Sequence, residues 1–414
     1  MLRDLARKGL FDVLAANVMA QAVGFVVLLA LPRFVDPHVF GSIRVLQSTG
    51  DLLVIFGGFG YNTAVLVTAA GSHSREQAEW ILRTATKRTL LASGAVWLLS
   101  ILVSLMGVLG GTPLAGRWLP LYALAVPAFA LTLLLAAWLQ AHSRLREMAR
   151  TQTLARILAA VLVMAATWRF GVPGFVAGTV VAAFAGMALM LRQVSMSFLR
   201  SIPDTLPFAF DRYARQSLAA NLFQTTGRYA DLLILGLFAT ASAELGPYAI
   251  ATVLVIPVFV FAGAVQTTCI PGFSSRRSDA DGLRSAVDRL QGETLLAAAA
   301  LAVAIQLAAP TILSAFYPPS YEAALPFLGI LLLHAVLRAG TSIYGAGQIA
   351  IGRTDLNAFA SGLSALMGLV AGYVGLRVGG LVGLAWAQAI VSATLVIGYP
   401  ALFRAGLRRL ESGK

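Results

Sequence analysis

The chain is poor in the residues on which much protein chemistry depends. It has one cysteine, Cys269, three lysines and four histidines in 414 residues. A single cysteine excludes an intramolecular disulfide and a CxxC site, and His38, His73, His142 and His334 form no HExxH or similar metal motif. No lysine follows a GxxxxG segment, which excludes a P-loop and a pump driven by its own nucleotide hydrolysis. We therefore expect neither a metal nor a cofactor.

Charged residues are also scarce, at 12% of the chain, whereas 58% of the residues are hydrophobic and the mean hydropathy is +0.80. A water-soluble core could not hide this much apolar surface, so we predict an all-α integral membrane protein. A membrane-spanning helix needs about 20 apolar residues. Twelve such runs occur, at approximately 12–32, 45–70, 89–110, 118–141, 152–170, 172–191, 213–239, 246–270, 292–316, 325–350, 355–376 and 380–403. Pro127 and Pro257 fall within two of these runs and are expected to kink their helices.

The positive charges are distributed unevenly among the loops. Of the 31 Lys and Arg residues, 24 fall in the two termini and alternate loops, 5 fall in the intervening loops, and Arg228 and Arg338 fall within predicted spans. Cytoplasmic loops carry such an excess, so we expect both termini in the cytoplasm and an even number of spans. The net charge of +13 then reflects topology among membrane lipids, and we expect no nucleic-acid partner. The first run follows basic residues as a secretory signal would, but it is too long, and we expect it to be retained.

A repeat relates the two halves of the sequence. The segment Ala15-Ala16-Asn17 with Gln21 returns 204 positions later as Ala219-Ala220-Asn221 with Gln224, and Phe40-Gly41 returns as Leu245-Gly246. Six spans in each half predict a parallel repeat about an axis along the membrane normal. We expect one six-helix bundle over residues 1–198, a cytoplasmic linker over 199–212 and a second bundle over 213–414. The alternative is that small-residue helices look alike by chance.

Four polar residues recur at helical spacing in the seventh span. Asn221, Gln224, Arg228 and Asp231 are 3, 4 and 3 positions apart, which places them on one face of a helix. A charge at the bilayer centre costs about 2.5–3.5 kcal/mol or more, so this face should avoid lipid. The alternative for Arg228 and Asp231 is a mutual ion pair that only tolerates burial.

The tenth span carries a second polar face. His334, Arg338, Thr341, Gly345 and Gln348 follow one another at spacings of 4, 3, 4 and 3. No acidic residue lies within a turn of Arg338, which favours contact with water or with an anionic ligand over a cross-helix structural pair. For His334, helix packing competes with proton transfer as its role.

The first half contains the matching polar residues. Asn17 and Gln21 form a stripe on the first span, and Arg44, Asp51 and either Gln47 or Ser48 form another at the start of the second. For Arg44 the alternative is that it extends to the outer interface, and Asp51 would then pair with it through the same face.

These features together resemble the polysaccharide transporter family. The similarity rests on the two halves, on Asn17 and Gln21, and on the segment Arg228-Tyr-Ala-Asp231-Leu-Leu-Ile-Leu-Gly236 followed by Leu245-Gly246-Pro247-Tyr248. This family contains the O-antigen and lipid-linked oligosaccharide flippases of the multidrug/oligosaccharidyl-lipid/polysaccharide exporter superfamily. The resemblance extends over essentially the whole chain, although the chain is short for the family and its outer loops are minimal.

The resemblance implies two bundles in a V-shaped arrangement in the bacterial inner membrane, with transport by alternating access through a central cavity. The implied substrate is a polyprenyl-pyrophosphate-linked repeat unit of O-antigen, capsule or exopolysaccharide, with a proton or a sodium ion as coupling ion. A pyrophosphate group attracts arginine donors in a low-dielectric cavity, so Arg228 and Arg338 are the expected ligands. Neutral hydrogen bonds would come from Asn17, Gln21, Asn221, Gln224 and Gln348.

Two other functions compete with this one. A multidrug and toxin extruder of the same superfamily would export cations and commonly relies on acidic cavity residues, whereas the residues predicted inside this membrane favour arginine. A membrane-embedded O-antigen ligase or glycosyltransferase would resemble its relatives in having a large outward loop with catalytic residues. The outward loops predicted here are about a dozen residues or fewer and carry no carboxylate pair, so we do not expect an enzyme.

Overall fold

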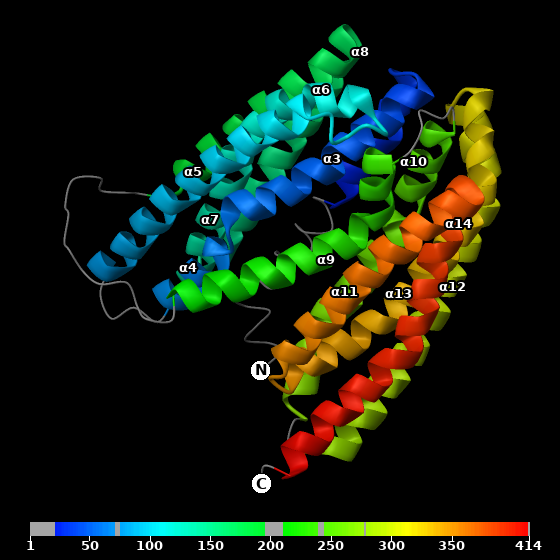
Figure 1. The fold of residues 1–414 in the computed structure, drawn as a ribbon. Coiled ribbons are helices and arrows are strands. Elements are labelled where there is room, and N and C mark those ends of the chain that lie inside the picture. The colour runs from blue at the N-terminus through cyan, green and yellow to red at the C-terminus, as the bar shows by residue number, and fades with distance from the viewer. Residues whose placement is uncertain (1–20, 71–74, 195–209, 239–243, 277–278, 413–414) are drawn as a thin grey trace. The chain divides into compact units, whose positions relative to one another are not determined.

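A computed structural model describes residues 21–70, 75–194, 210–238, 244–276 and 279–412 of the chain (Figure 1). Helix makes up 92% of the structure, and none of the residues in these ranges forms a strand. This confirms the predicted all-α class. The reason is that a helix satisfies every backbone donor and acceptor within its own segment, which a lipid environment requires.

The helices follow one another with short connections. Their order is η1 (Leu31–Arg33), α3 (Pro37–Gly58), α4 (Tyr61–Ala70), α5 (Arg75–Leu105), α6 (Pro113–Tyr122), η2 (Ala123–Ala125), α7 (Val126–Ala141), α8 (Leu145–Leu191), α9 (Phe210–Phe238), α10 (Leu245–Leu254), α11 (Ile256–Ser274), α12 (Ala280–Phe316), η3 (Pro319–Ala324), α13 (Leu325–Ala350) and α14 (Thr354–Ser412). Residues 21–30, before η1, are also helical.

The chain folds into two compact units. Unit 1 comprises residues 1–35 and 42–225, and unit 2 comprises residues 36–41 and 226–414. The division therefore falls within α9, and the first turn of α3 belongs to unit 2. Most of the predicted linker, residues 199–212, lies outside the described residues, so the two six-helix bundles stay a prediction.

Eight helices of the described part are long and apolar enough to cross a membrane. Two of them double back on themselves. In α8, Gly171 has a φ of 64°, and a Cβ on Gly178 would lie 3.1 Å from the Ala166 Cβ in the other arm. In α14, Gly380 has a φ of 59°, and Gly372 and Gln388 meet across the bend. These bends confirm the predicted boundaries between residues 170 and 172 and between 376 and 380, since glycine adopts positive φ without strain. The count of twelve spans stays a prediction.

One predicted span is wrong in its bounds. The run expected at 45–70 begins earlier, at Pro37, and is divided into α3 and α4 by Phe59 and Gly60, whose φ values are 46° and 71°. A continuous apolar run does not reveal such a break, because hydropathy measures composition and not backbone direction. Pro127 is the second residue of α7, and Pro257 is the second residue of α11. In the first turn of a helix the backbone N–H has no partner within the helix, so a proline there costs no hydrogen bond.

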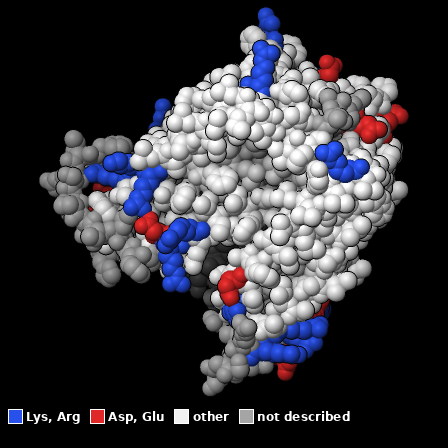
Figure 2. Space-filling model, viewed as in Figure 1, with Lys and Arg blue, Asp and Glu red and all other residues white. Residues whose placement is uncertain are grey.

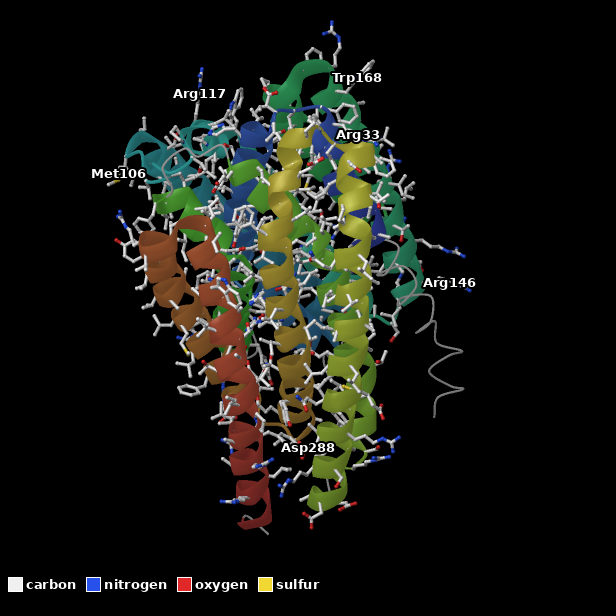
Figure 3. All side chains as sticks on the ribbon, turned by 90° about the vertical axis from the view of Figure 1, so that its right-hand side faces the viewer. Arg33, Met106, Arg117, Arg146, Trp168 and Asp288 are labelled. Carbon is white, nitrogen blue, oxygen red and sulfur yellow. The ribbon has the colours of Figure 1, made fainter. Side chains whose placement is uncertain are left out.

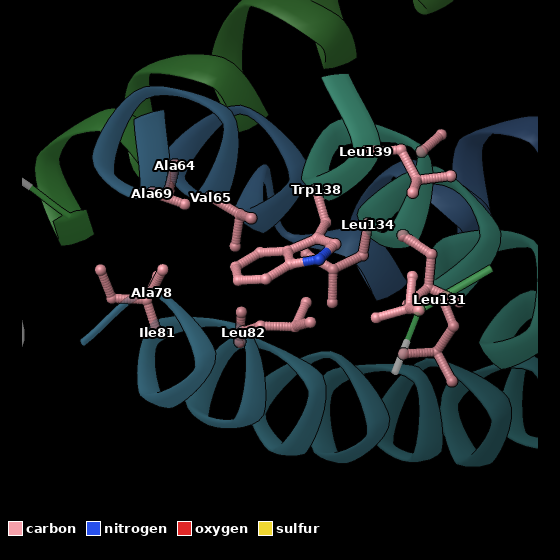
Figure 4. Close-up of a cluster of buried hydrophobic side chains, with 14 of the residues drawn as sticks. Ala64, Val65, Ala69, Ala78, Ile81, Leu82, Leu131, Leu134, Trp138 and Leu139 are labelled. Atoms are coloured by element: carbon pink, nitrogen blue, oxygen red, sulfur yellow. The ribbon is translucent and has the colours of Figure 1, made fainter. Parts of the chain in front are cut away.

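The core of unit 1 lies between α4, α5, α7 and α8 (Figure 4). Figure 4 shows the Trp138 ring of α7 among Val65, Leu82 and Leu134, and its side chain is buried. Deleting a large buried ring of this kind removes about 3–5 kcal/mol of stability in well-packed cores. This core therefore holds the helices of unit 1 in place around the polar residues that they carry.

Unit 2 packs α11, α12, α13 and α14 together, with Ile343 and Phe403 fully buried. In the same unit the first turn of α3 lies against the start of α10. A Cβ on Gly41 would overlap the Leu245 side chain, at 2.6 Å, and a Cβ on Gly246 would overlap the backbone of Pro37. Gly41 and Gly246 are the glycines of the predicted repeat, so the two copies of the motif contact each other. Small residues allow such a close approach of two helices.

The surface carries large apolar side chains that a water-soluble protein would bury. Leu105 on α5 is 81% exposed and Ile397 on α14 is 79% exposed. On the face shown in Figure 2, most of the surface belongs to uncharged residues. Such a surface is suited to the hydrocarbon of a bilayer.

The topology prediction can be tested by cysteine labelling. Within unit 1, Figure 3 shows Arg33, Arg117 and Trp168 near one end, with Arg146 well away from them. In a Cys269→Ser background, we expect Arg150→Cys and Arg284→Cys to resist a membrane-impermeant maleimide in intact cells, because both belong to arginine-rich loops. Arg117→Cys should label and is the positive control. Labelling at positions 150 and 284 without cell lysis would show that the orientation is wrong.

Candidate functional site

Arg338 is placed by α13, whose bounds equal the span predicted at 325–350. The helix follows η3, with Pro326 as its second residue, and its side chains are apolar except along one face. The Arg338 side chain is half-buried, and its Nη1 donates a hydrogen bond of 2.6 Å to Ser364 Oγ of α14. Its Nη2 lies 3.7 Å from the position that a Cβ on Gly227 of α9 would take. Three helices of unit 2 therefore meet at this guanidinium group, and Ser364, the side chain that accepts its hydrogen bond, is neutral.

Arg228 follows Gly227 on α9 and is exposed. Its neighbour Gly227 lies against the Arg338 guanidinium, so the two arginines belong to the same part of unit 2. Within the described ranges, neither arginine forms an ion pair. Two like charges in the same part of a set of apolar helices raise the free energy of the empty site, and an anion near both would lower it.

Asp231 lies in the same unit beyond a kink. Tyr229 has a φ of −112° and a ψ of 17°, which interrupts α9 between Arg228 and Asp231. Asp231 Oδ2 accepts a hydrogen bond of 3.1 Å from the Tyr248 hydroxyl of α10, and Oδ1 accepts one of 2.8 Å from the Leu232 backbone N–H. The stripe predicted over Asn221, Gln224, Arg228 and Asp231 assumes a continuous helix, and this kink divides it.

His334 lies one turn before Arg338 and joins α13 to the second arm of α14. Its Nδ1 is 2.8 Å from Ser392 Oγ and 3.0 Å from the backbone oxygen of Gln388. The Gln388 amide in turn donates a bond of 3.0 Å to the Gly368 carbonyl in the first arm. The His334 ring thus makes helix-packing contacts within unit 2, which is one of the two roles expected for it.

Gln348 lies further along α13 and is fully buried. Neither its amide oxygen nor its amide nitrogen has a hydrogen-bond partner among the described residues. A buried amide that makes no hydrogen bond costs about 1–3 kcal/mol, so this position is energetically unfavourable as it stands. Its role as a substrate ligand stays a prediction.

The remaining candidates belong to unit 1. Gln21 and Gln224 are exposed, and Asn221 donates a bond of 3.2 Å to Ser217 Oγ. Asn17 lies outside the described residues. Their place in a central cavity stays a prediction.

Arg44 is buried in unit 1, with only 7% of its surface exposed, so it does not extend to the interface. Its Nη1 donates a bond of 2.9 Å to Gln47 Oε1, and its Nε has no partner in the described part of the chain. Ser48 bonds to its own helix at Val45 O, so Gln47 is the stripe partner. Asp51, two turns along, is exposed.

The structure brings Arg228, His334 and Arg338 together in unit 2, and it adds residues that the sequence analysis missed. These are Ser364, Gln388 and Ser392, which make the polar contacts just described. Their only sequence signal is that Gln388 and Ser392 stand four residues apart in an apolar run. Across the described ranges, no three His, Cys, Asp or Glu side chains are grouped as metal ligands would be.

Known proteins resemble this chain in sequence and in fold. The teichuronic acid biosynthesis protein TuaB of Bacillus subtilis (strain 168) is 26% identical over 196 residues, which are 47% of this chain and 39% of that protein. The chain thus matches well under half the length of this relative.

Solved structures share the fold of the whole chain. The lipid II flippase MurJ in an inward closed conformation superposes with a TM-score of 0.75 at 15% identity, covering 93% of this chain and 86% of MurJ. An inward-facing multidrug resistance MATE family transporter of the MOP superfamily gives a TM-score of 0.67 at 13% identity, covering 96% of each chain. At these identities the likeness shows the fold alone, and both folds are those of transporters.

The family model described as "Polysaccharide biosynthesis protein" matches residues 6–276, which is more than half of the sequence and includes Arg228 and Asp231. The segment that carries the predicted resemblance, from Arg228 to Tyr248, lies inside this match. The chain therefore belongs to the polysaccharide biosynthesis protein family.

Proposed function

We propose that this protein is a flippase that moves a polyprenyl-pyrophosphate-linked oligosaccharide across the cytoplasmic membrane by alternating access. Arg228 and Arg338 bind the pyrophosphate, and the lipid tail stays in the bilayer. The family membership supports a role in polysaccharide synthesis. The transporter folds of the solved relatives support movement of a substrate across the membrane.

The observation that carries this proposal is the pair of arginines in unit 2. Arg338 hydrogen-bonds a neutral serine, and the exposed Arg228 follows Gly227, which lies against the Arg338 guanidinium. A pyrophosphate offers several negatively charged oxygens, and a guanidinium binds two such oxygens at once through its planar fork. An anionic headgroup therefore offsets the cost of holding both arginines among apolar helices.

The same pair argues against export of cationic drugs. A cation approaching Arg228 and Arg338 would meet like charge, which costs free energy in a low-dielectric environment. Asp231, the acidic residue nearest to Arg228 in the sequence, accepts hydrogen bonds from Tyr248 and Leu232. A multidrug extruder would need an acidic group exposed to its substrate.

A reconstituted assay separates the two transport functions. Proteoliposomes would contain either a fluorescent short-chain polyprenyl-pyrophosphate oligosaccharide or the cationic dye ethidium. We expect the protein to make the glycolipid accessible to a membrane-impermeant quencher, while ethidium stays where it was loaded, because only the glycolipid carries the charge that the arginines attract. Protein-free liposomes give the spontaneous rate. Movement of ethidium without movement of the glycolipid would refute the proposal.

A further inference from the structure

The bend of α8 exposes three large side chains in a row. Trp168 is 72% exposed and Phe170 is 64% exposed, and Arg169 between them is exposed as well. Gly171, with its positive φ, turns the chain directly after them. Gly174 then packs so tightly on the first arm that an added Cβ would overlap the backbone there. The two arms therefore close on each other, and the tip between them presents its side chains outward.

The length of α8 places this tip at a membrane surface. No charged residue occurs between Gly171 and Arg192, and these 20 residues extend about 30 Å as a helix. The hydrocarbon core of a bilayer is about 30 Å thick as well. When Arg192 lies at one headgroup layer, the bend therefore lies at the other. Figure 3 shows Trp168 at one end of unit 1, in the same region as Arg33 and Arg117.

The hydrogen-bonding groups at the tip have donors to spare. The Arg169 guanidinium lies over the Phe170 ring, with its Cζ 5.3 Å from the ring centroid. Within the described part of the chain, Arg169 forms no ion pair and neither Arg169 nor Trp168 makes a side-chain hydrogen bond. The ring attracts the cation but takes up no N–H, so all five donors of the guanidinium stay available. Topology does not account for this charge, since Arg169 is one of the 5 Lys and Arg residues in the sparsely charged loops.

We infer that Trp168, Arg169 and Phe170 form a binding site for one anionic phospholipid of the leaflet at this end of α8. Arg169 donates to the phosphate oxygens. The Trp168 N–H donates to an ester carbonyl just below the phosphate, at the depth where tryptophan is enriched in membrane proteins. Phe170 holds the guanidinium in place and contacts the upper part of the acyl chains. The site fixes the depth of the bend in the bilayer, and it does not depend on the proposed flippase activity.

The bend of α14 offers a matched arginine without such a site. Arg377 precedes the bend at Gly380, and its Cζ also lies 5.3 Å from the ring centroid of an aromatic residue, Tyr373. Its Nε, however, donates a hydrogen bond of 3.2 Å to the Tyr373 hydroxyl, and no tryptophan lies between residue 373 and Gly380. Arg377 therefore has fewer free donors than Arg169 and no indole beside it.

Tryptophan quenching in proteoliposomes of the full-length protein tests the site. The bilayers are phosphatidylcholine with a fraction of either phosphatidylglycerol or phosphatidylcholine that is brominated in the upper part of its acyl chains, since bromine quenches an indole that it contacts. Subtracting the same measurement on Trp168→Phe isolates the emission of Trp168. We expect phosphatidylglycerol to be preferred beside Trp168 about fivefold, because an arginine near an anionic lipid surface contributes about that factor.

Arg169→Gln and Arg377→Gln are then compared, each with its own Trp168→Phe reference. Arg169→Gln should remove the preference, so that both lipids quench Trp168 equally, whereas Arg377→Gln should keep it. If neither brominated lipid quenches Trp168, this side chain does not face lipid and the site is wrong. An unchanged preference in Arg169→Gln, or an equal loss in Arg377→Gln, would mean that the net charge of the protein alone attracts the lipid. The thermal midpoint of each variant shows whether its fold is intact.

Discussion

Replacing Arg338 with alanine is expected to abolish glycolipid flipping, while the protein still inserts in the membrane. The substitution removes the guanidinium that bonds Ser364 and lies against Gly227, and a lost charged hydrogen bond is worth about 1.5–3 kcal/mol. Loss of two such bonds to a bidentate phosphate lowers the rate at least about 100-fold. Arg338→Lys should retain part of the activity, because a point charge still attracts phosphate without the planar fork. The measurement is the initial quenching rate in proteoliposomes.

Arg377 supplies the matched control for this substitution. It is an exposed arginine of unit 2 whose Nε bonds the Tyr373 hydroxyl, and Arg377→Ala should flip glycolipid at the wild-type rate. Arg228→Ala should also reduce flipping, and combining it with Asp231→Ala distinguishes loss of substrate contact from loss of stability. If Arg338→Ala and Arg228→Ala both reach normal membrane levels and flip at the wild-type rate, the arginines serve packing alone.

Substituting alanine for Gly246 is expected to destabilise the protein, although alanine normally favours a helix. A Cβ at this position overlaps the carbonyl oxygen and carbon of Pro37, which are backbone atoms that cannot rotate away. Overpacking of this kind costs about 1–3 kcal/mol, which exceeds the gain of about 1 kcal/mol from replacing glycine within a helix. The midpoint of thermal unfolding in detergent, measured by size-exclusion chromatography of heated samples, should be lower than that of the wild type.

Gly263→Ala is the control for the steric argument. Gly263 lies inside α11, and its added Cβ would have no neighbour within 4 Å. This variant should unfold at the same temperature as the wild type or higher, because only the helix propensity changes. Equal midpoints for Gly246→Ala and Gly263→Ala would mean that α3 and α10 do not pack closely at the repeated glycines.

Local signals in the sequence predicted much of the helix pattern. The span at 325–350 coincides with α13, and the boundaries at 170–172 and 376–380 coincide with the bends at Gly171 and Gly380. The break at Phe59 and Gly60 escaped prediction, because the apolar run continues through it. The kink at Tyr229 escaped as well, since neither a proline nor a glycine marks it at that residue.

The candidate site was predicted less completely than the helices. Helical spacing identified Arg228, His334 and Arg338, which the structure brings together in unit 2. The same spacing placed Gln348 on the polar face but could not indicate that it is fully buried without a partner. It also gave no reason to choose Ser364 as the partner of Arg338, because that contact joins two different helices.

The sequence by itself determined the class of the protein and the residues that lipid cannot solvate. It does so because a bilayer requires long apolar segments with internal backbone hydrogen bonds, and both properties are local. Only the tertiary structure decided which polar groups meet, such as Arg338 with Ser364 and His334 with Ser392. Those contacts depend on the register and crossing of separate helices, which side-chain packing sets and helical periodicity along one segment does not record.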